Sequence, residues 1–203
     1  FRWEIAVSTA CSILGVNAFN QPNGEVSKKI TKTKIAAFQK KGKLKEGKPV
    51  WKKDGVQVFS SAGVTGASLK SVLNGFLKKS KPGGYVAINA YLPRNGEMIS
   101  ALQNLRVAIR TKTGNAVTAG FGPRFQHSTG QFHKGGPKNV LFIQITAEPE
   151  KDLAIPAEGM TFGTLIRAQA LGDYEALVEA NRKVLRVHLP SVRAVKLLAE
   201  ALG

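Results

Sequence analysis

Cysteine is nearly missing from the sequence, which contains one residue of this type, Cys11, among 203. One cysteine excludes an internal disulfide, and a thiol inside an apolar stretch is usually a small hydrophobic side chain. That stretch, Ile5 to Val16, is the most apolar one near the start of the chain, but its twelve residues cannot span a bilayer. It also lacks a basic leader and a cleavage pattern. We therefore expect a cytoplasmic protein with no targeting segment and no membrane partner.

Acidic residues are also scarce: 13 Asp and Glu stand against 30 Lys and Arg, which gives a formal net charge of +17. The excess is uneven, because the segment from Gly24 to Asp54 contains eleven lysines and three acids. Such an excess favours anionic partners, which include nucleic acids, anionic membranes and phosphorylated metabolites. Most of these lysines are expected on a solvated face, so charge alone does not choose between the partners.

Nucleotide-binding signatures are absent. The polar loop from Ser60 to Ser68 leads into a helix, but it lacks the Gly-Lys-Ser/Thr ending of a Walker loop. The stretch Gly120-Phe121-Gly122 lacks the third glycine of the dinucleotide fingerprint. Backbone amides of the 60–68 loop can still hold a phosphate, and the competing interpretation is a helix cap after a flexible loop. We expect no nucleotide cofactor.

Strands and helices alternate after Tyr85. Strands, most of them apolar on both faces, are predicted at 85–92, 116–119, 139–145 and 184–189, with amphipathic helices between them. Buried strands separated by such helices are typical of a parallel sheet that is covered on both sides. The sequence therefore predicts an α/β fold with three layers, in which a mostly parallel sheet of about four or five strands is flanked by helices.

The part of the chain before Tyr85 differs. A first helix is expected to end at Gly15, and Pro22 stands in the first turn of a second, largely exposed helix that runs to about Lys40. The pair Asp54-Gly55 predicts a β-hairpin, because both residues accept a positive φ. Further along, the helical pattern between 162 and 180 is expected to break at Gly172-Asp173.

A first polar cluster, Asn20 to Lys28, can carry chemistry. Gln21 precedes a helix N-terminus and Lys28 lies about two turns into that helix, so both side chains can face one ligand. Ligands of doubly wound sheets bind outside the carboxyl ends of the strands, and the polar clusters of this chain fall at such ends or at helix starts. The competing interpretation is a polar helix cap followed by a surface lysine.

A second polar cluster, Arg124 to Pro137, follows a predicted strand and contains His127 and His133. Imidazole exchanges protons near neutral pH, so a histidine at a strand end is a candidate acid–base group. The alternative for each histidine is a hydrogen-bonded bystander. No metal site is expected, because Cys11 is far away in sequence and no close carboxylate pair supplies further zinc ligands. Lys134 is counted with the solvated lysines.

Together the two clusters resemble phosphoglucose isomerase. The family signature Phe-Asp-Gln-x-Gly-Val-Glu-x-x-Lys is similar to Phe19 to Lys28, which keeps Phe, Gln, Glu and Lys at the right spacings and has Asn20 for Asp. The second family element, a His followed by Ser and by Gln four residues after the His, looks like His127 to Gln131. The longer run His127 to Pro137 resembles the branch of the family that is fused to transaldolase, as do further stretches at 1–4, 85–88 and 162–170. In stand-alone isomerases the His element comes first in the chain, whereas here the Lys element does.

The resemblance implies the reversible conversion of glucose 6-phosphate and fructose 6-phosphate, without a cofactor or metal. It implies that Gln21 contacts the substrate, that Lys28 assists at the hydroxyl on carbon one and that His127 moves a proton at the ring oxygen. The family's proton-shuttling glutamate, in a Glu-Ser-Asn-Gly-like motif, does not occur in this sequence, and neither does its Ser/Thr phosphate loop.

The resemblance also implies a domain organisation and partners. We expect residues 1–203 to be the C-terminal, sugar-isomerase-like lobe of the enzyme, with a helical arm at 1–45, and to be inactive alone. An upstream lobe and a transaldolase domain are expected outside this chain. The implied partners are the sugar phosphate substrate, the remaining part of the same polypeptide and a second copy in a homodimer.

Two other functions stay open. A basic nucleic-acid-binding domain is favoured by the charge, but the aromatic residues are not interleaved with the lysines and no nucleic-acid-binding module is recognised. A steep salt dependence of binding to arbitrary DNA would support it. The third possibility is a fragment that serves only as a stable structural unit.

Overall fold

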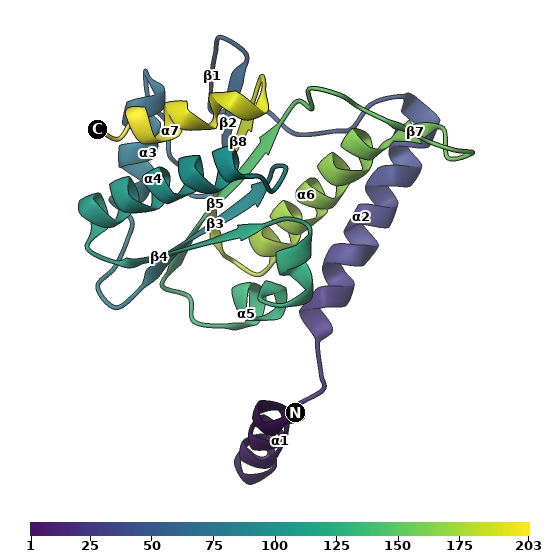
Figure 1. Cartoon of the computed structure of the whole chain (residues 1–203), viewed down its shortest axis with the longest axis vertical. Coiled ribbons are helices and arrows are strands. Elements are labelled where there is room, and N and C mark those ends of the chain that lie inside the picture. The colour runs from purple at the N-terminus through teal and green to yellow at the C-terminus, as the bar shows by residue number, and fades with distance from the viewer.

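A six-stranded sheet forms the centre of the structure, a computed structural model that describes all residues from Phe1 to Gly203. Helices cover both faces of this sheet (Figure 1). Its strands are β1 (Trp51–Lys53), β2 (Val56–Ser60), β3 (Tyr85–Tyr91), β4 (Ala116–Phe121), β5 (Val140–Ala147) and β8 (Lys183–Leu189), in the order β1-β2-β8-β5-β3-β4. A separate two-stranded sheet consists of β6 (Ala154–Ile155) and β7 (Met160–Thr161). The predicted α/β fold with a mostly parallel sheet flanked by helices is confirmed.

Four strands, β8, β5, β3 and β4, run parallel to one another. The other two form an antiparallel hairpin whose second strand, β2, pairs with β8. At the hairpin turn Asp54 and Gly55 have φ values of 48° and 78°, the positive values that a two-residue turn between twisted strands requires. The hairpin predicted from this pair is therefore confirmed, and it extends the sheet beyond the four or five strands expected.

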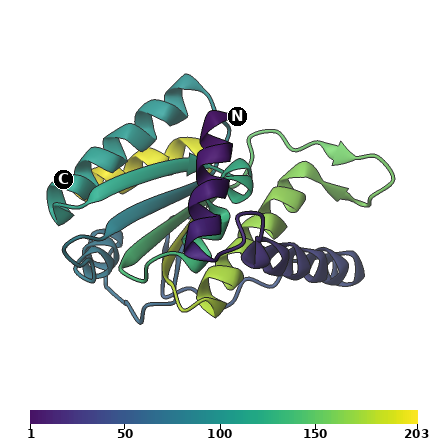
Figure 2. The same ribbon diagram turned by 90° about the horizontal axis from the view of Figure 1, so that it is seen from below.

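The helices fall into two groups. Their bounds are α1 (Arg2–Leu14), α2 (Pro22–Lys41), α3 (Leu69–Leu77), α4 (Gly96–Thr113), α5 (Gly130–Gly135), α6 (Phe162–Glu179) and α7 (Lys196–Glu200), with 3₁₀ turns η1 (Arg124–His127) and η2 (Val192–Val195). Helices α3, α4 and α7 bury residues such as Leu73, Leu105 and Leu198 in the larger core against Ile88 and Ile143 of the sheet. Figure 2 shows α4 and α7 on one side of the sheet and α6 and α2 on the other.

The sheet face toward α6 changes character along the strands. Residues in register across β3, β5 and β8 form three successive rows: Ala87-Phe142-Val184, Asn89-Gln144-Arg186 and Tyr91-Thr146-His188. The first row packs on Leu177 of α6, and all of these residues are buried. Because parallel strands share one direction, the polar rows gather toward the carboxyl ends, where ligands of such sheets bind.

Helix α6 runs without a break from Phe162 to Glu179, so the predicted break at Gly172-Asp173 is wrong. Gly172 lies where α2 packs on α6: a Cβ atom there would lie 2.2 Å from Thr31 Oγ1 and 3.1 Å from the Ser27 carbonyl oxygen. The missing side chain is what lets the two helices approach, which is a frequent reason for a glycine inside a helix. Asp173 is buried and paired with a lysine described below.

Helix α1 stands apart from the other elements in Figure 1, and none of its residues is buried. Gly15 ends it with a φ of 67°, and Pro22 occupies the first turn of α2, both as predicted. Among the apolar side chains of α1 and the residue before it, Phe1, Trp3 and Ile13 are more than 80% exposed. No helix in the structure has the length and apolar composition that crossing a bilayer requires.

Candidate functional site

The N-terminus of α2 lies against the segment from η1 to α5, and a pocket of about 470 Å³ opens between them. Gln21 from the first segment and His127 and Gln131 from the second line this pocket. The fold therefore brings Gln21 of the first cluster together with His127 and Gln131 of the second.

One hydrogen bond joins the two segments directly. The backbone N–H of Asn23 donates to Gln131 Oε1 over 3.0 Å, between residues that are 108 positions apart. Gly135 lies close to the same spot, since a Cβ atom there would be 3.1 Å from Asn23 Nδ2. The Gln131 side chain thus satisfies one of the backbone N–H groups that the start of a helix leaves without an intrahelical partner.

Gln21 is the residue before the first turn of α2, but its side chain makes no capping hydrogen bond. Pro22 follows it at a position where a missing N–H costs nothing, because the first turn has no partner for that group. The Gln21 amide is exposed and lines the pocket, so both its donors and its acceptor are free for a ligand. Gln21 therefore stands at the cap position of α2 without capping the helix through its side chain.

Lys28 lies outside the pocket. Its ammonium pairs with Glu25 Oε1 at 2.7 Å, and 60% of its side chain is exposed. The hydrogen bond and charge of Lys28 lower the pKa of the Glu25 carboxyl. Exposed pairs of this kind hold their members weakly, so the ammonium stays available to another anion.

His127 ends η1, is exposed and makes no side-chain hydrogen bond within the chain. Its imidazole therefore faces the pocket without a fixed partner and can give or take a proton at a bound molecule. The backbone before it is anchored by Gln126, whose Nε2 donates to the hydroxyl of Tyr91 at the end of β3. Burial raises the pKa of the Tyr91 hydroxyl well above its usual value, so the hydroxyl stays protonated.

Lys134 is buried, and the prediction that it belongs with the solvated lysines is wrong. Its ammonium donates to Asp173 Oδ1 over 2.6 Å, and the two side chains are only 3% and 1% exposed. Burial raises the pKa of the Asp173 carboxyl, and the charge of Lys134 opposes this rise. The pair fastens α5 to α6.

Arg182 anchors the end of the same segment. Its guanidinium donates to the carbonyl oxygens of Lys134, Gly136 and Pro137, at 2.8 Å for Pro137. His127 and Gln131 therefore lie between two anchored points of the chain. One is the hydrogen bond from Gln126 to Tyr91, and the other is the set of hydrogen bonds from the Arg182 guanidinium. This arrangement holds in place the backbone segment that carries His127 and Gln131.

The other histidine of the cluster, His133, has a packing role. It is buried between the rings of Phe125 and Phe142, at centroid distances of 5.9 and 5.2 Å. Its Nδ1 has no hydrogen-bond partner. Burial, with the nearby charges of Lys134 and Arg182, lowers the pKa of His133 to about 4. The ring is neutral at pH 7 and does not line the pocket.

Acid is expected to destabilise the protein through His133. The folded-state pKa of about 4 lies below the ordinary value of 6.5, so on acidification the unfolded state binds a proton first. Stability from this group is complete above pH 6.5 and falls as the pH drops toward 4, by roughly 2–3 kcal/mol at pH 4.5. Urea unfolding at pH 7 and 4.5 measures the loss, and His133→Phe, which keeps the aromatic packing, should remove that share of it. If both proteins lost the same stability between pH 7 and pH 4.5, groups other than His133 would be responsible for the loss.

The loop from Ser60 to Ser68 caps the start of α3. The Ser68 side chain accepts from the Ser71 N–H, and Ser71 Oγ accepts from the Ser68 N–H, which completes a capping box. Ser61 Oγ accepts from the N–H of Val184 on β8. The helix-cap interpretation of this loop is therefore confirmed.

Sequence reasoning missed the residues that fasten the pocket: Tyr91, Asp173 and Arg182. In the sequence Asp173 is an acid next to a glycine, a pair that predicted a break in the helix. Arg182 follows a turn and resembles one more surface cation. No local signal distinguishes these residues, because their partners lie between 35 and 48 positions away.

Part of the chain is similar in sequence to known proteins. No family model matches the chain. Among curated proteins, the glucose-6-phosphate isomerases of two Thermus thermophilus strains are 32% and 33% identical to it over 92 residues. These matches cover 40% of the chain and 22% of each relative, so the chain spans about a fifth of the length of the relatives it matches.

One solved structure, of a hypothetical protein from Thermus thermophilus, is 26% identical with a TM-score of 0.48, and the match covers 58% of this chain and 34% of that one. Over part of its length, the chain is distantly related in sequence to bacterial glucose-6-phosphate isomerase.

Proposed function

We propose that this chain forms part of a glucose-6-phosphate isomerase, in which it supplies the groups that bind and open the sugar ring. The observation that carries the proposal is the junction of the two clusters. Gln21 and His127, which belong to separate motifs of one enzyme family, line a single pocket. Two segments that far apart in sequence have no local reason to meet. The partial similarity to the Thermus isomerases supports the same function.

In this proposal His127 transfers a proton at the ring oxygen. Ring opening breaks the bond between carbon one and the ring oxygen in glucose 6-phosphate, so the ring oxygen gains a proton while the hydroxyl on carbon one loses one. An exposed imidazole with no fixed partner can serve as the acid in this step. The free amide of Gln21 can hold a substrate hydroxyl.

Lys28 assists at the hydroxyl on carbon one in this proposal. Since its ammonium lies outside the pocket and pairs with Glu25, it has to leave that carboxylate, or act at a site completed by another subunit. A homodimer is proposed for this reason. The weak hold of an exposed ion pair makes the first route accessible.

The groups for the second half of the reaction are proposed to lie outside this chain. Conversion of the open aldose to the ketose needs a base that moves a proton between carbons one and two. The sequence contains no motif of the kind that supplies this glutamate. We therefore propose an upstream lobe of the same polypeptide, with a fused transaldolase domain as in the branch that the chain resembles, and a cytoplasmic location.

The isolated chain of 203 residues is expected to convert fructose 6-phosphate slowly or not at all. The measurement is a coupled assay of glucose 6-phosphate formation, carried out on the isolated chain and on the full-length polypeptide at equal concentration. Activity in the full-length polypeptide alone is the expected result. An enzyme-like rate in the isolated chain would show that the proton-shuttling base lies within it, and no activity in either would overturn the proposed function.

A further inference from the structure

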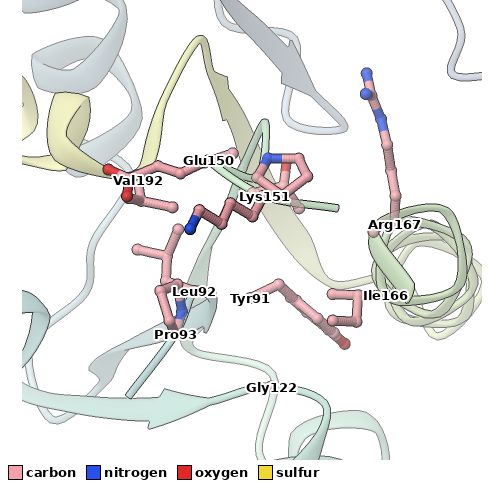
Figure 3. Close-up of a pocket in the computed structure, with 13 residues that line it drawn as sticks. Tyr91, Leu92, Pro93, Gly122, Glu150, Lys151, Ile166, Arg167 and Val192 are labelled. Carbon is pink, nitrogen blue, oxygen red and sulfur yellow. The ribbon is translucent and has the colours of Figure 1, made fainter. Parts of the chain in front are cut away.

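A second cavity, of about 420 Å³, lies at the carboxyl ends of the parallel strands (Figure 3). It shares no lining residue with the Gln21–His127 pocket. Tyr91 ends β3, Thr146 stands near the end of β5, Gly122 follows β4, and Lys151 comes from the loop after β5. This is the place where open α/β sheets bind their ligands, and nothing in the proposed isomerase chemistry uses it.

The walls of this cavity are largely apolar. Figure 3 shows Leu92 and Pro93 on one side, Val192 above them and Ile166 of α6 opposite, with the ring of Tyr91 between. The volume lies in the range of small-molecule sites, which combine apolar walls with a few polar groups that fix orientation. The walls therefore suit a ligand with a compact apolar body.

Lys151 gives the cavity one cation without a partner. Its side chain extends into the cavity in Figure 3, whereas the guanidinium of Arg167 points away. Three of the surrounding acids are paired with arginines: Glu46 with Arg167 and Arg186, Glu148 with Arg167, and Glu150 with Arg193. A fourth acid, Asp152, accepts a hydrogen bond from the backbone N–H of Gly163. Lys151 is in none of these ion pairs. An ammonium without an ion-pair partner can hold a carboxylate, whereas a dianion would need a second cation.

Thr146 gives the cavity a hydrogen-bond acceptor. His188 Nε2 lies 3.0 Å from Glu148 Oε1, and a carboxylate accepts only, so Nε2 carries the ring proton. Burial and the charge of Arg167 lower the pKa of His188, which keeps the ring neutral and makes Nδ1 an acceptor. Thr146 Oγ1 lies 2.9 Å from His188 Nδ1 and therefore donates its proton to that nitrogen. Its remaining lone pair is left to accept from a ligand.

We propose that this cavity binds a small organic monoanion: a carboxylate with an apolar body and one hydroxyl or amino donor. The ammonium of Lys151 holds the carboxylate, the apolar walls enclose the body, and Thr146 accepts the hydrogen bond from the donor. A phosphate monoester carries close to two negative charges at pH 7 and would be short of cations here. This site does not depend on the isomerase function.

Calorimetric titration of the protein with 3-phenylpropanoate and 3-(4-hydroxyphenyl)propanoate tests the site. We expect saturable binding of both probes at one site, with the hydroxyl-bearing probe bound several-fold more tightly. Lys151→Met should weaken both about two- to five-fold, because the exposed ammonium that holds the carboxylate is lost. Lys138→Met, a matched change of an exposed lysine away from the cavity, should change neither.

Thr146→Val should remove the preference for the hydroxyl-bearing probe. Because this change also leaves His188 Nδ1 without a partner, Lys151→Met, at an exposed position, tests the site even if the valine variant fails to fold. Absence of saturable binding by both probes would overturn the proposal, and so would unchanged affinity in Lys151→Met. Displacement of the probes by inorganic phosphate at lower concentration than by a second propanoate would overturn the assignment to carboxylates.

Discussion

Replacing Lys134 with alanine is expected to lower the free energy of unfolding by about 3–5 kcal/mol, because a buried carboxylate loses its cation. Asp173 is 1% exposed, and water cannot reach it to replace the ammonium. The pair also fastens the segment that carries His127 to α6. The variant should therefore unfold at much lower urea concentration, with local loosening of the pocket.

Two further variants show whether the loss of stability in Lys134→Ala comes from the broken ion pair or from any change of a lysine in this segment. Lys138→Ala changes an exposed lysine nearby in the chain and should cost less than about 0.5 kcal/mol. The double change Lys134→Met with Asp173→Leu removes both charges at similar volume and should be much less destabilising than Lys134→Ala alone. If Lys134→Ala and Lys138→Ala had equal stability, the buried pair would not hold α5 in place.

Replacing His127 with alanine in the full-length polypeptide is expected to lower the rate of fructose 6-phosphate conversion by about 10²–10⁴-fold, since general acid–base catalysis by one positioned side chain is typically worth this much. The side chain is exposed and makes no hydrogen bond, so the urea midpoint should not change. Loss of activity without loss of stability would distinguish a chemical role from a structural one.

Lys28→Ala should act in the same direction as His127→Ala. The control is Lys138→Ala, another exposed lysine, since the burial of Lys134 would mix a folding defect with any effect on catalysis. If Lys138→Ala reduced the rate as much as the other two, general attraction of the phosphate by the basic surface would explain the activity better than the proposed roles.

The fold was largely predictable because its signals are local. A strand such as 85–91, which is apolar on both faces except at Asn89, requires helices on both sides of the sheet. The pair Asp54-Gly55 specifies a tight hairpin through its own backbone preferences. The prediction failed where a residue serves a distant partner. Gly172 is inside α6 because α2 packs there, and Lys134 is buried because Asp173 lies opposite.

The candidate site was predictable as two clusters but not as a pocket. The residue types near Gln21 and His127 could be recognised within about ten residues of sequence. Their meeting depends on the packing of α2 on α6 and on the hydrogen bond from Asn23 to Gln131. The position of Lys28 outside the pocket depends in the same way on the helical phase of α2 and on its pairing with Glu25.

A comparison of two substrate forms tests most directly whether the Gln21 and His127 segments form one ring-opening site. The full-length polypeptide and its His127→Ala variant would be assayed with ring-closed fructose 6-phosphate and with an open-chain sugar phosphate that cannot cyclise. If His127 moves the proton at the ring oxygen, its loss should slow the ring-closed substrate far more than the open-chain one. An equal loss on both substrates, or none on either, would contradict the assignment.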